Sequence, residues 1–262
     1  MNKKGMLVAM ACMLALAVPA MADDVIYNGS DLWQTKGDGK TFADFSREPI
    51  PAGFFCAKSE PFTDRIAFKG VPLRSSEGTL PIDTIVQRLD DAGFDNKGVA
   101  MTRIQMRALL LESVAPVKTA CGSFHVKVRL NGRQPVTRMR IVRQGEDGGF
   151  FVSNLAVNAK LSFHPVSGKA RERLEINQRI RFNPSRTAWA VRSDNNKSVE
   201  KKGFLLVDTD GDNRPDTYLP GTSNFAAGWR AVQGKARYDN TDVVIDEGWH
   251  ENPTHEHTVT GW

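Results

Sequence analysis

Four aspartates gather in the nine-residue run DTDGDNRPD, which begins at Asp208 and ends at Asp216. Asp210 and Asp212 lie between them, so three of the carboxylates occur at every second position. Like charges at this spacing repel one another, and a bound cation offsets that repulsion. Carboxylate and carbonyl oxygens are the ligands that calcium takes in proteins. The run therefore predicts a loop that binds calcium in a structural role, through the four carboxylates and the backbone carbonyl of Arg214.

The residues around the aspartates indicate which class of calcium-binding loop the run can form. The sixth position of a calcium loop is usually glycine, and here it is Asn213, which tolerates the left-handed backbone region better than most residues. The twelfth position is Leu219 instead of a bidentate glutamate, and Pro220 follows it, so a helix–loop–helix EF-hand is excluded. The run closely resembles the DxDxDGxxD loops of thrombospondin type 3 repeats and related bacterial extracellular proteins, with Asn in place of Gly. That resemblance implies calcium but no particular activity; the alternative is a solvated acidic turn without metal.

A second group of ligand-type residues lies near the end of the sequence. His250, His255 and His257 occur within eight residues of one another, together with Glu251 and Glu256. Imidazole nitrogens at alternating positions of a strand suit a transition metal if a third ligand folds in. Histidine-rich terminal segments are more often solvent-exposed. The sequence therefore favours an exposed segment over a second metal site.

The N-terminal segment has the features of a signal peptide. Lys3 and Lys4 precede an apolar run over residues 6–18, and small residues follow it before Asp23. We expect residues 1–22 to be removed and the protein to be exported, to the periplasm, the cell surface or the extracellular medium. The apolar run is shorter than the ~20 residues of a membrane-spanning helix, and no other stretch approaches that length, so no transmembrane segment is expected.

Two cysteines, Cys56 and Cys121, remain after the predicted cleavage. An oxidising compartment favours a disulfide between them. Such a crosslink closes a long loop and stabilises by on the order of 4 kcal/mol in the chain-entropy model.

The middle of the chain alternates polar and apolar residues with period two, which is typical of half-buried antiparallel strands. The expected strands cover residues 102–106, 124–130, 138–143 and 174–182, with hairpin-turn residues at 131–132, 146–149 and 167–168. Residues 84–92 fit a short helix about as well as a strand and turn. The pattern predicts an all-β protein, an antiparallel β-sandwich of immunoglobulin-like architecture over residues 23–192, with a possible second small β region in residues 193–262.

Charge is distributed unevenly: the net charge is −4 over residues 23–98, +12 over residues 99–192 and −5 over residues 193–262. The expected strands of the middle third carry a stripe of cations on alternate positions: Arg103, Arg107, Lys127, Arg129, Arg138, Arg140, Arg179 and Arg181. The sequence favours a solvated sheet face for them. If they share one face, they form a surface for anionic polysaccharide. We expect no nucleic-acid partner, because few aromatic residues interleave with the cations.

Motifs of several enzyme classes are absent: the sequence has no GxSxG elbow, phosphate loop, dinucleotide fingerprint or HExxH. Trp33, Trp189, Trp229 and Trp249 are either core residues or a surface for carbohydrate stacking. Segments such as IPAGFFC and FKGVPL are similar to an uncharacterised group of exported bacterial proteins, which implies export and β structure. We expect a non-enzymatic binding or structural module. The alternatives are a secreted polysaccharide hydrolase and a subunit of a surface assembly that binds another surface protein.

Overall fold

A computed structural model describes residues 24–35, 37–38, 41–146, 148–168, 172–182, 186–191 and 203–227, and the backbone of strands over 229–232, 235–238 and 257–260. Strands and loops account for all of these residues, so the expected all-β fold class is confirmed. The predicted signal peptide lies outside the described residues. The described part of the chain contains no helix with the length and apolar character that crossing a membrane requires.

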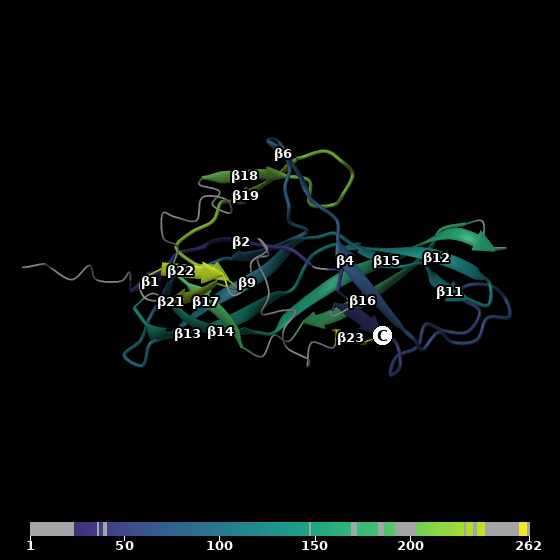
Figure 1. The fold of residues 1–262 in the computed structure, drawn as a ribbon, viewed down its shortest axis with the longest axis horizontal. Helices are drawn as coiled ribbons and strands as arrows, with labels where there is room; N and C mark the ends of the chain where they lie inside the picture. The colour runs from purple at the N-terminus through teal and green to yellow at the C-terminus, as the bar shows by residue number, and fades with distance from the viewer. Residues whose placement is uncertain are drawn as a thin grey trace, which may run out of the picture.

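One large sheet has seven strands and lies at the left of Figure 1. All of its pairs are antiparallel. Its strands, in sheet order, are β2 (Gly29–Trp33), β7 (Thr84–Arg88), β9 (Val99–Leu109), β13 (Val136–Gly145), β14 (Gly148–Ser153), β17 (Thr187–Ala190) and β20 (Ala226–Ala227). Residues 84–92, which fit helix and strand about equally well, therefore begin with strand β7.

The second large sheet has eight strands and extends to the right of the molecule in Figure 1. Its strands, in sheet order, are β10 (Leu111–Ser113), β4 (Arg65–Gly70), β3 (Phe42–Asp44), β23 (His257–Thr260), β16 (Leu174–Phe182), β15 (Leu155–Gly168), β12 (Gly122–Leu130) and β11 (Val117–Thr119). Because β10 pairs with both β4 and β12, the sheet curls back on itself. The contact between β23 and β3 is parallel. The two large sheets are strongly curved, in keeping with the expected antiparallel sandwich.

Three small sheets complete the described strands. The four-stranded sheet has the order β19 (Thr217–Pro220), β18 (Phe204–Val207), β5 (Arg74–Ser75), β6 (Gly78–Thr79). The two-stranded sheets are β1 (Val25–Ile26) with β8 (Ala92–Gly93), and β21 (Trp229–Val232) with β22 (Lys235–Tyr238). Strands that follow residue 192 thus pair with strands that precede it, as β18 does with β5. The division of the chain at residues 192–193 stays a prediction.

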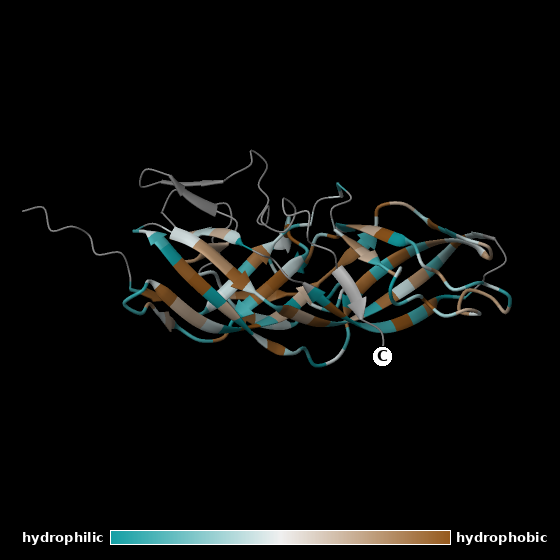
Figure 2. Cartoon of the chain, turned by 90° about the horizontal axis from the view of Figure 1, so that it is seen from below, coloured by the Kyte–Doolittle hydropathy of each residue, from teal (hydrophilic) through white to brown (hydrophobic). Residues whose placement is uncertain are grey.

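Consecutive strands carry the chain from one large sheet into the other. Only Leu110 separates β9 from β10, and only Asn154 separates β14 from β15. The inward side chains of both sheets therefore belong to one hydrophobic cluster. Apolar and polar residues alternate along the strands (Figure 2), as period two requires. The four expected strands correspond to β9, β12, β13 and β16, so these predictions are confirmed.

The disulfide between Cys56 and Cys121 is present, with the two Cα atoms 6.0 Å apart. It joins the loop after Ile50 to the turn between β11 and β12. The neighbouring Phe55 is buried and makes edge-to-face contact with Phe163, with ring centroids 5.3 Å apart. The crosslink thus fixes a long loop over the end of the eight-stranded sheet.

Candidate metal centre

The acidic run forms the connection between β18 and β19. These two strands pair from Phe204 with Pro220 to Val207 with Thr217, so the run begins directly after one strand and ends directly before the other. The Asp208 N–H donates to the carbonyl of Arg74 at 2.9 Å, which extends the contact of β18 with β5. The four-stranded sheet therefore fixes both ends of the loop.

Within the loop, the first aspartate organises the backbone. Asp208 is 2% exposed. Its Oδ1 accepts the Gly211 N–H at 2.6 Å and its Oδ2 accepts the Asn213 N–H at 2.8 Å. Asp210 and Asp212 repeat the pattern, accepting from the backbone N–H two residues ahead at 3.1 and 2.7 Å respectively. The chain therefore winds around its own carboxylates.

Two residues in the left-handed region allow this winding. Asn213 has φ of 73° and is the non-glycine residue with positive φ among the described residues; Gly211 has φ of 75°. The prediction that Asn213 makes the sharp turn normally given to glycine is confirmed.

The winding brings three carboxylates together. One oxygen from each of Asp208, Asp210 and Asp212 lies within 4.8 Å of the others, and the group could hold a metal ion. Asp216 is not in this group, and its Oδ1 accepts a hydrogen bond from the Thr217 hydroxyl at 3.1 Å. The structure thus unites three of the predicted ligands, while the Arg214 carbonyl and the Asp216 carboxylate stay predictions as ligands.

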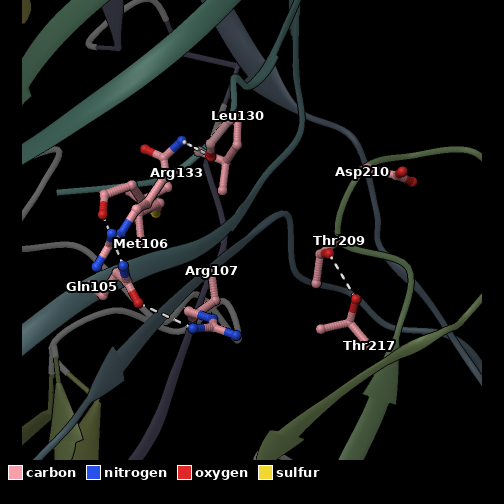
Figure 3. Close-up of a pocket in the computed structure, with 10 residues that line it drawn as sticks. Gln105, Met106, Arg107, Leu130, Arg133, Thr209, Asp210 and Thr217 are labelled. Atoms are coloured by element: carbon pink, nitrogen blue, oxygen red, sulfur yellow. Dashed lines mark hydrogen bonds between the residues drawn. The ribbon is translucent and has the colours of Figure 1, made fainter. Parts of the chain in front are cut away.

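A cavity of about 420 Å³ separates one side of the loop from the large sheets. Figure 3 shows Thr209, Asp210 and Thr217 on one wall, with the Thr209 and Thr217 hydroxyls joined at 3.1 Å. Arg107 and Arg133 lie on the opposite wall. The guanidinium of Arg107 donates to Gln105 Oε1 at 3.0 Å. The acidic loop therefore faces a basic surface.

The cationic stripe does not form one sheet face. Arg103, Arg107, Arg138 and Arg140 belong to β9 and β13 of the seven-stranded sheet, where Arg138 lies directly opposite Arg103. Lys127, Arg129, Arg179 and Arg181 belong to β12 and β16 of the eight-stranded sheet. The condition under which all eight cations would form one anion-binding surface is therefore not met, because consecutive strands of the chain belong to different sheets.

On the eight-stranded sheet, the cations gather over β12, β15 and β16. Arg129 lies directly opposite Lys160, and Lys127 opposite Ser162. Ser162 in turn lies opposite Glu175, whose carboxylate pairs with Lys160 at 3.1 Å and with Arg173. The hydrogen bond from Lys160, followed by that from Arg173, holds the pKa of Glu175 below its usual range. Lys160, Arg173 and Glu175 were not identified from the sequence, since their proximity depends on the register of β15 with its neighbours.

The remaining sequence candidates divide into core residues and residues beyond the described part of the chain. Trp33 and Trp189 are 2% and 0% exposed, so they are core residues. His250, His255 and Trp249 lie outside the described residues, as do the side chains of His257 and Trp229. The second metal site stays a prediction.

The three carboxylates could hold a metal ion, and a cation lies beside them, because the Arg129 guanidinium donates to the carbonyl of Asp210 at 3.0 Å. Comparison of the chain with protein-family models, with curated proteins and with solved structures finds no match in any of the three.

Proposed function

We propose that the protein is an exported, non-enzymatic binding module, that calcium at the 208–216 loop stabilises it, and that its partners are anionic polysaccharides. The observation that carries the proposal is the meeting of the Asp208, Asp210 and Asp212 carboxylates on a loop already shaped around them. Calcium fits this donor set better than softer metals, because all three side-chain donors are hard carboxylate oxygens.

Export is supported by the signal-peptide features of residues 1–22 and by the disulfide, which persists in oxidising compartments. A calcium loop also agrees with export, because calcium sites of extracellular modules have dissociation constants of ~10⁻⁴–10⁻³ M. Such sites are filled by the millimolar calcium found outside the cell.

A hydrolase receives less support. Glycosidases need a carboxylic acid whose pKa is raised, beside a second carboxylate in a cleft. Glu175, on the outer face of the eight-stranded sheet, has a lowered pKa because Lys160 and Arg173 bind it. Asp83 has a raised pKa, about 6, but its side chain is buried in the core.

The calcium proposal is tested by thermal unfolding. With calcium one hundredfold above its dissociation constant, mass action stabilises the folded state by about 2.7 kcal/mol, or roughly 5–10 °C in Tm for a chain of this size. Between chelator and 10 mM calcium we expect that rise for a dissociation constant of ~10⁻⁴ M and about half of it for ~10⁻³ M. Magnesium should give little rise, because it demands octahedral geometry.

A double substitution, Asp210→Asn with Asp212→Asn, should abolish the rise. Asparagine keeps the Oδ1 acceptors that the Asp212 and Arg214 N–H groups use, so the loop shape survives while two negative charges are lost. Glu60→Gln with Asp64→Asn makes the same charge change at exposed residues outside the loop and should leave the rise intact. A wild-type Tm that calcium does not move would reduce the loop to an acidic turn.

The anionic partner is tested by retention on an immobilised sulfated polysaccharide. Cations on the outer face of β12 and β16 should make retention fall steeply with salt, because screening weakens exposed charges. We expect elution at higher salt than from a simple sulfonate cation exchanger run in parallel. Elution at the same or lower salt would mean that net charge alone holds the protein.

A further inference from the structure

A second cavity, of about 250 Å³, adjoins the acidic loop at Asp210 and lies over the outer face of the eight-stranded sheet. Four cations line it, and the carboxylates on its wall are Glu175 and, at the loop, Asp210. The cations are Lys127, Arg129, Lys160 and Arg173. Register explains the convergence, because side chains directly opposite one another in adjacent strands share a face, and Arg129 lies opposite Lys160.

The cavity keeps an excess of positive charge after its internal pairing is counted. Glu175 is shared between Lys160 and Arg173. Among the described residues, Lys127 and Arg129 form no salt bridge with a carboxylate, and Arg129 donates instead to the neutral backbone carbonyl of Asp210 at 3.0 Å. The pKa of His164 is lowered, chiefly because the side chain is partly buried and secondly because the positive charge of Lys127 is near.

The metal loop forms one wall of this cavity. Asp210 belongs both to the group of three carboxylates and to the cavity lining. The Arg129 guanidinium packs against the loop so closely that a Cβ on Gly211 would lie 2.9 Å from its Cζ. A divalent cation bound by the three carboxylates would therefore cancel two of their three negative charges, next to residues that already favour an anion.

We propose that this cavity is a calcium-dependent binding site for a sulfate or carboxylate group of an acidic polysaccharide. The inference rests on the proposed function, since it requires calcium in the loop. Calcium neutralises Asp210, which otherwise repels the anion, and the anion relieves repulsion between calcium and the nearby Arg129. By linkage the two ligands strengthen each other's binding by the same factor, typically 5–150-fold for coupled sites.

Titration calorimetry of the full-length mature protein tests the coupling. The probes are calcium alone, then a sulfated heparin hexasaccharide and a hexamer of galacturonate, each in chelator and in 5 mM calcium. We expect at least one oligosaccharide to bind at least fivefold tighter with calcium, and the sulfated and carboxylated probes distinguish the two anionic groups. A single-stranded oligonucleotide is titrated in the same two conditions, as a polyanion that is not a polysaccharide.

Three variants locate the effect. Lys127→Gln with Lys160→Gln removes two cavity cations and should lose the calcium-dependent gain. Arg138→Gln with Arg140→Gln removes the same charge from exposed positions of the seven-stranded sheet and should keep it. Asp210→Asn with Asp212→Asn should bind the oligosaccharide with equal affinity in calcium and chelator, which separates calcium in the loop from calcium held by the oligosaccharide itself.

The outcomes distinguish the two proposals. Absence of heat from calcium alone, together with an unmoved Tm, overturns the proposed function. Calcium binding with oligosaccharide affinities equal in calcium and chelator overturns only the coupled site. The coupled site is also overturned if the Lys127/Lys160 and Arg138/Arg140 variants lose the calcium-dependent gain in oligosaccharide affinity equally. A calcium-dependent gain in affinity for the oligonucleotide alone would overturn it as well.

Discussion

Replacing Arg88 by methionine is expected to lower the free energy of unfolding by about 3–5 kcal/mol, the usual cost of breaking a buried ion pair from one side. Arg88 and Asp31 are 0% and 1% exposed, and the Arg88 Nε lies 3.1 Å from Asp31 Oδ2. Without the guanidinium, the Asp31 carboxylate loses the cation that compensates its burial.

The same guanidinium holds segments that are distant in sequence. Its Nη2 donates to the Ser223 hydroxyl at 2.9 Å and its Nη1 donates to the carbonyl of Tyr27. Its Cζ lies 4.7 Å from the centre of the Phe225 ring. Arg88 therefore ties the first strands to residues 223–225, and its loss should release both.

Urea denaturation of Arg88→Met measures the cost. Arg103→Met is the matched control, because the Arg103–Asp90 pair has a distance of 2.7 Å but is 59% and 40% exposed, and exposed pairs contribute about 0–1 kcal/mol. Adding Asp31→Asn to Arg88→Met should recover part of the loss, since both buried charges are then gone. A loss in Arg88→Met no larger than in Arg103→Met would contradict a stabilising role for the buried pair.

Local patterns in the sequence were sufficient for the strands and for the group of three carboxylates in the 208–216 loop. Alternation predicts β9, β12, β13 and β16 because one face of each strand is buried against the core. The carboxylate group was predictable for a similar reason: its three aspartates are near neighbours in sequence, and Asn213 marks the sharp turn of the loop.

Sheet membership depends on long-range pairing and was not predictable in this way. Asn131 and Gly132 have hairpin-turn chemistry, but β12 pairs with β15 and β13 pairs with β9, so the chain crosses between sheets there instead of turning back. The predicted hairpin is wrong at this point, and for the same reason the cations of β12 and β13 lie on different sheets. The turn predicted at residues 146–149 does join the paired strands β13 and β14.

The cationic cavity illustrates the same limit. Lys160 is separated from Arg129 by the whole of β13 and β14, and only the pairing of β12 with β15 places the two side chains opposite each other. Alternation shows that each side chain points outward, but it gives no information about which strand lies beside which.

Replacing Asp83 by asparagine is expected to remove a pH dependence of about 3 kcal/mol from the stability of the fold. Burial raises the pKa of Asp83 to about 6 from its ordinary value of 3.8, although hydrogen bonds from Thr84 and Thr35 oppose the rise. One pKa unit corresponds to about 1.4 kcal/mol. The side chain lies where the two large sheets meet: its Oδ2 accepts the Thr35 N–H at 2.6 Å, and a Cβ on Gly70 would lie 2.0 Å from that oxygen.

The sign follows from which state holds the proton more tightly. The folded state has the higher pKa, so the contribution of Asp83 is fully present below pH 3.8 and is lost as the pH rises through about 6. Urea denaturation of the wild type and Asp83→Asn at pH 4 and pH 8 gives the difference, since other titrating groups are common to both. We expect the wild type to lose roughly 2–3 kcal/mol relative to Asp83→Asn over this interval. If the free energies of unfolding of the two proteins differ by the same amount at pH 4 and pH 8, the Asp83 carboxyl titrates in the folded state as it does in the unfolded chain.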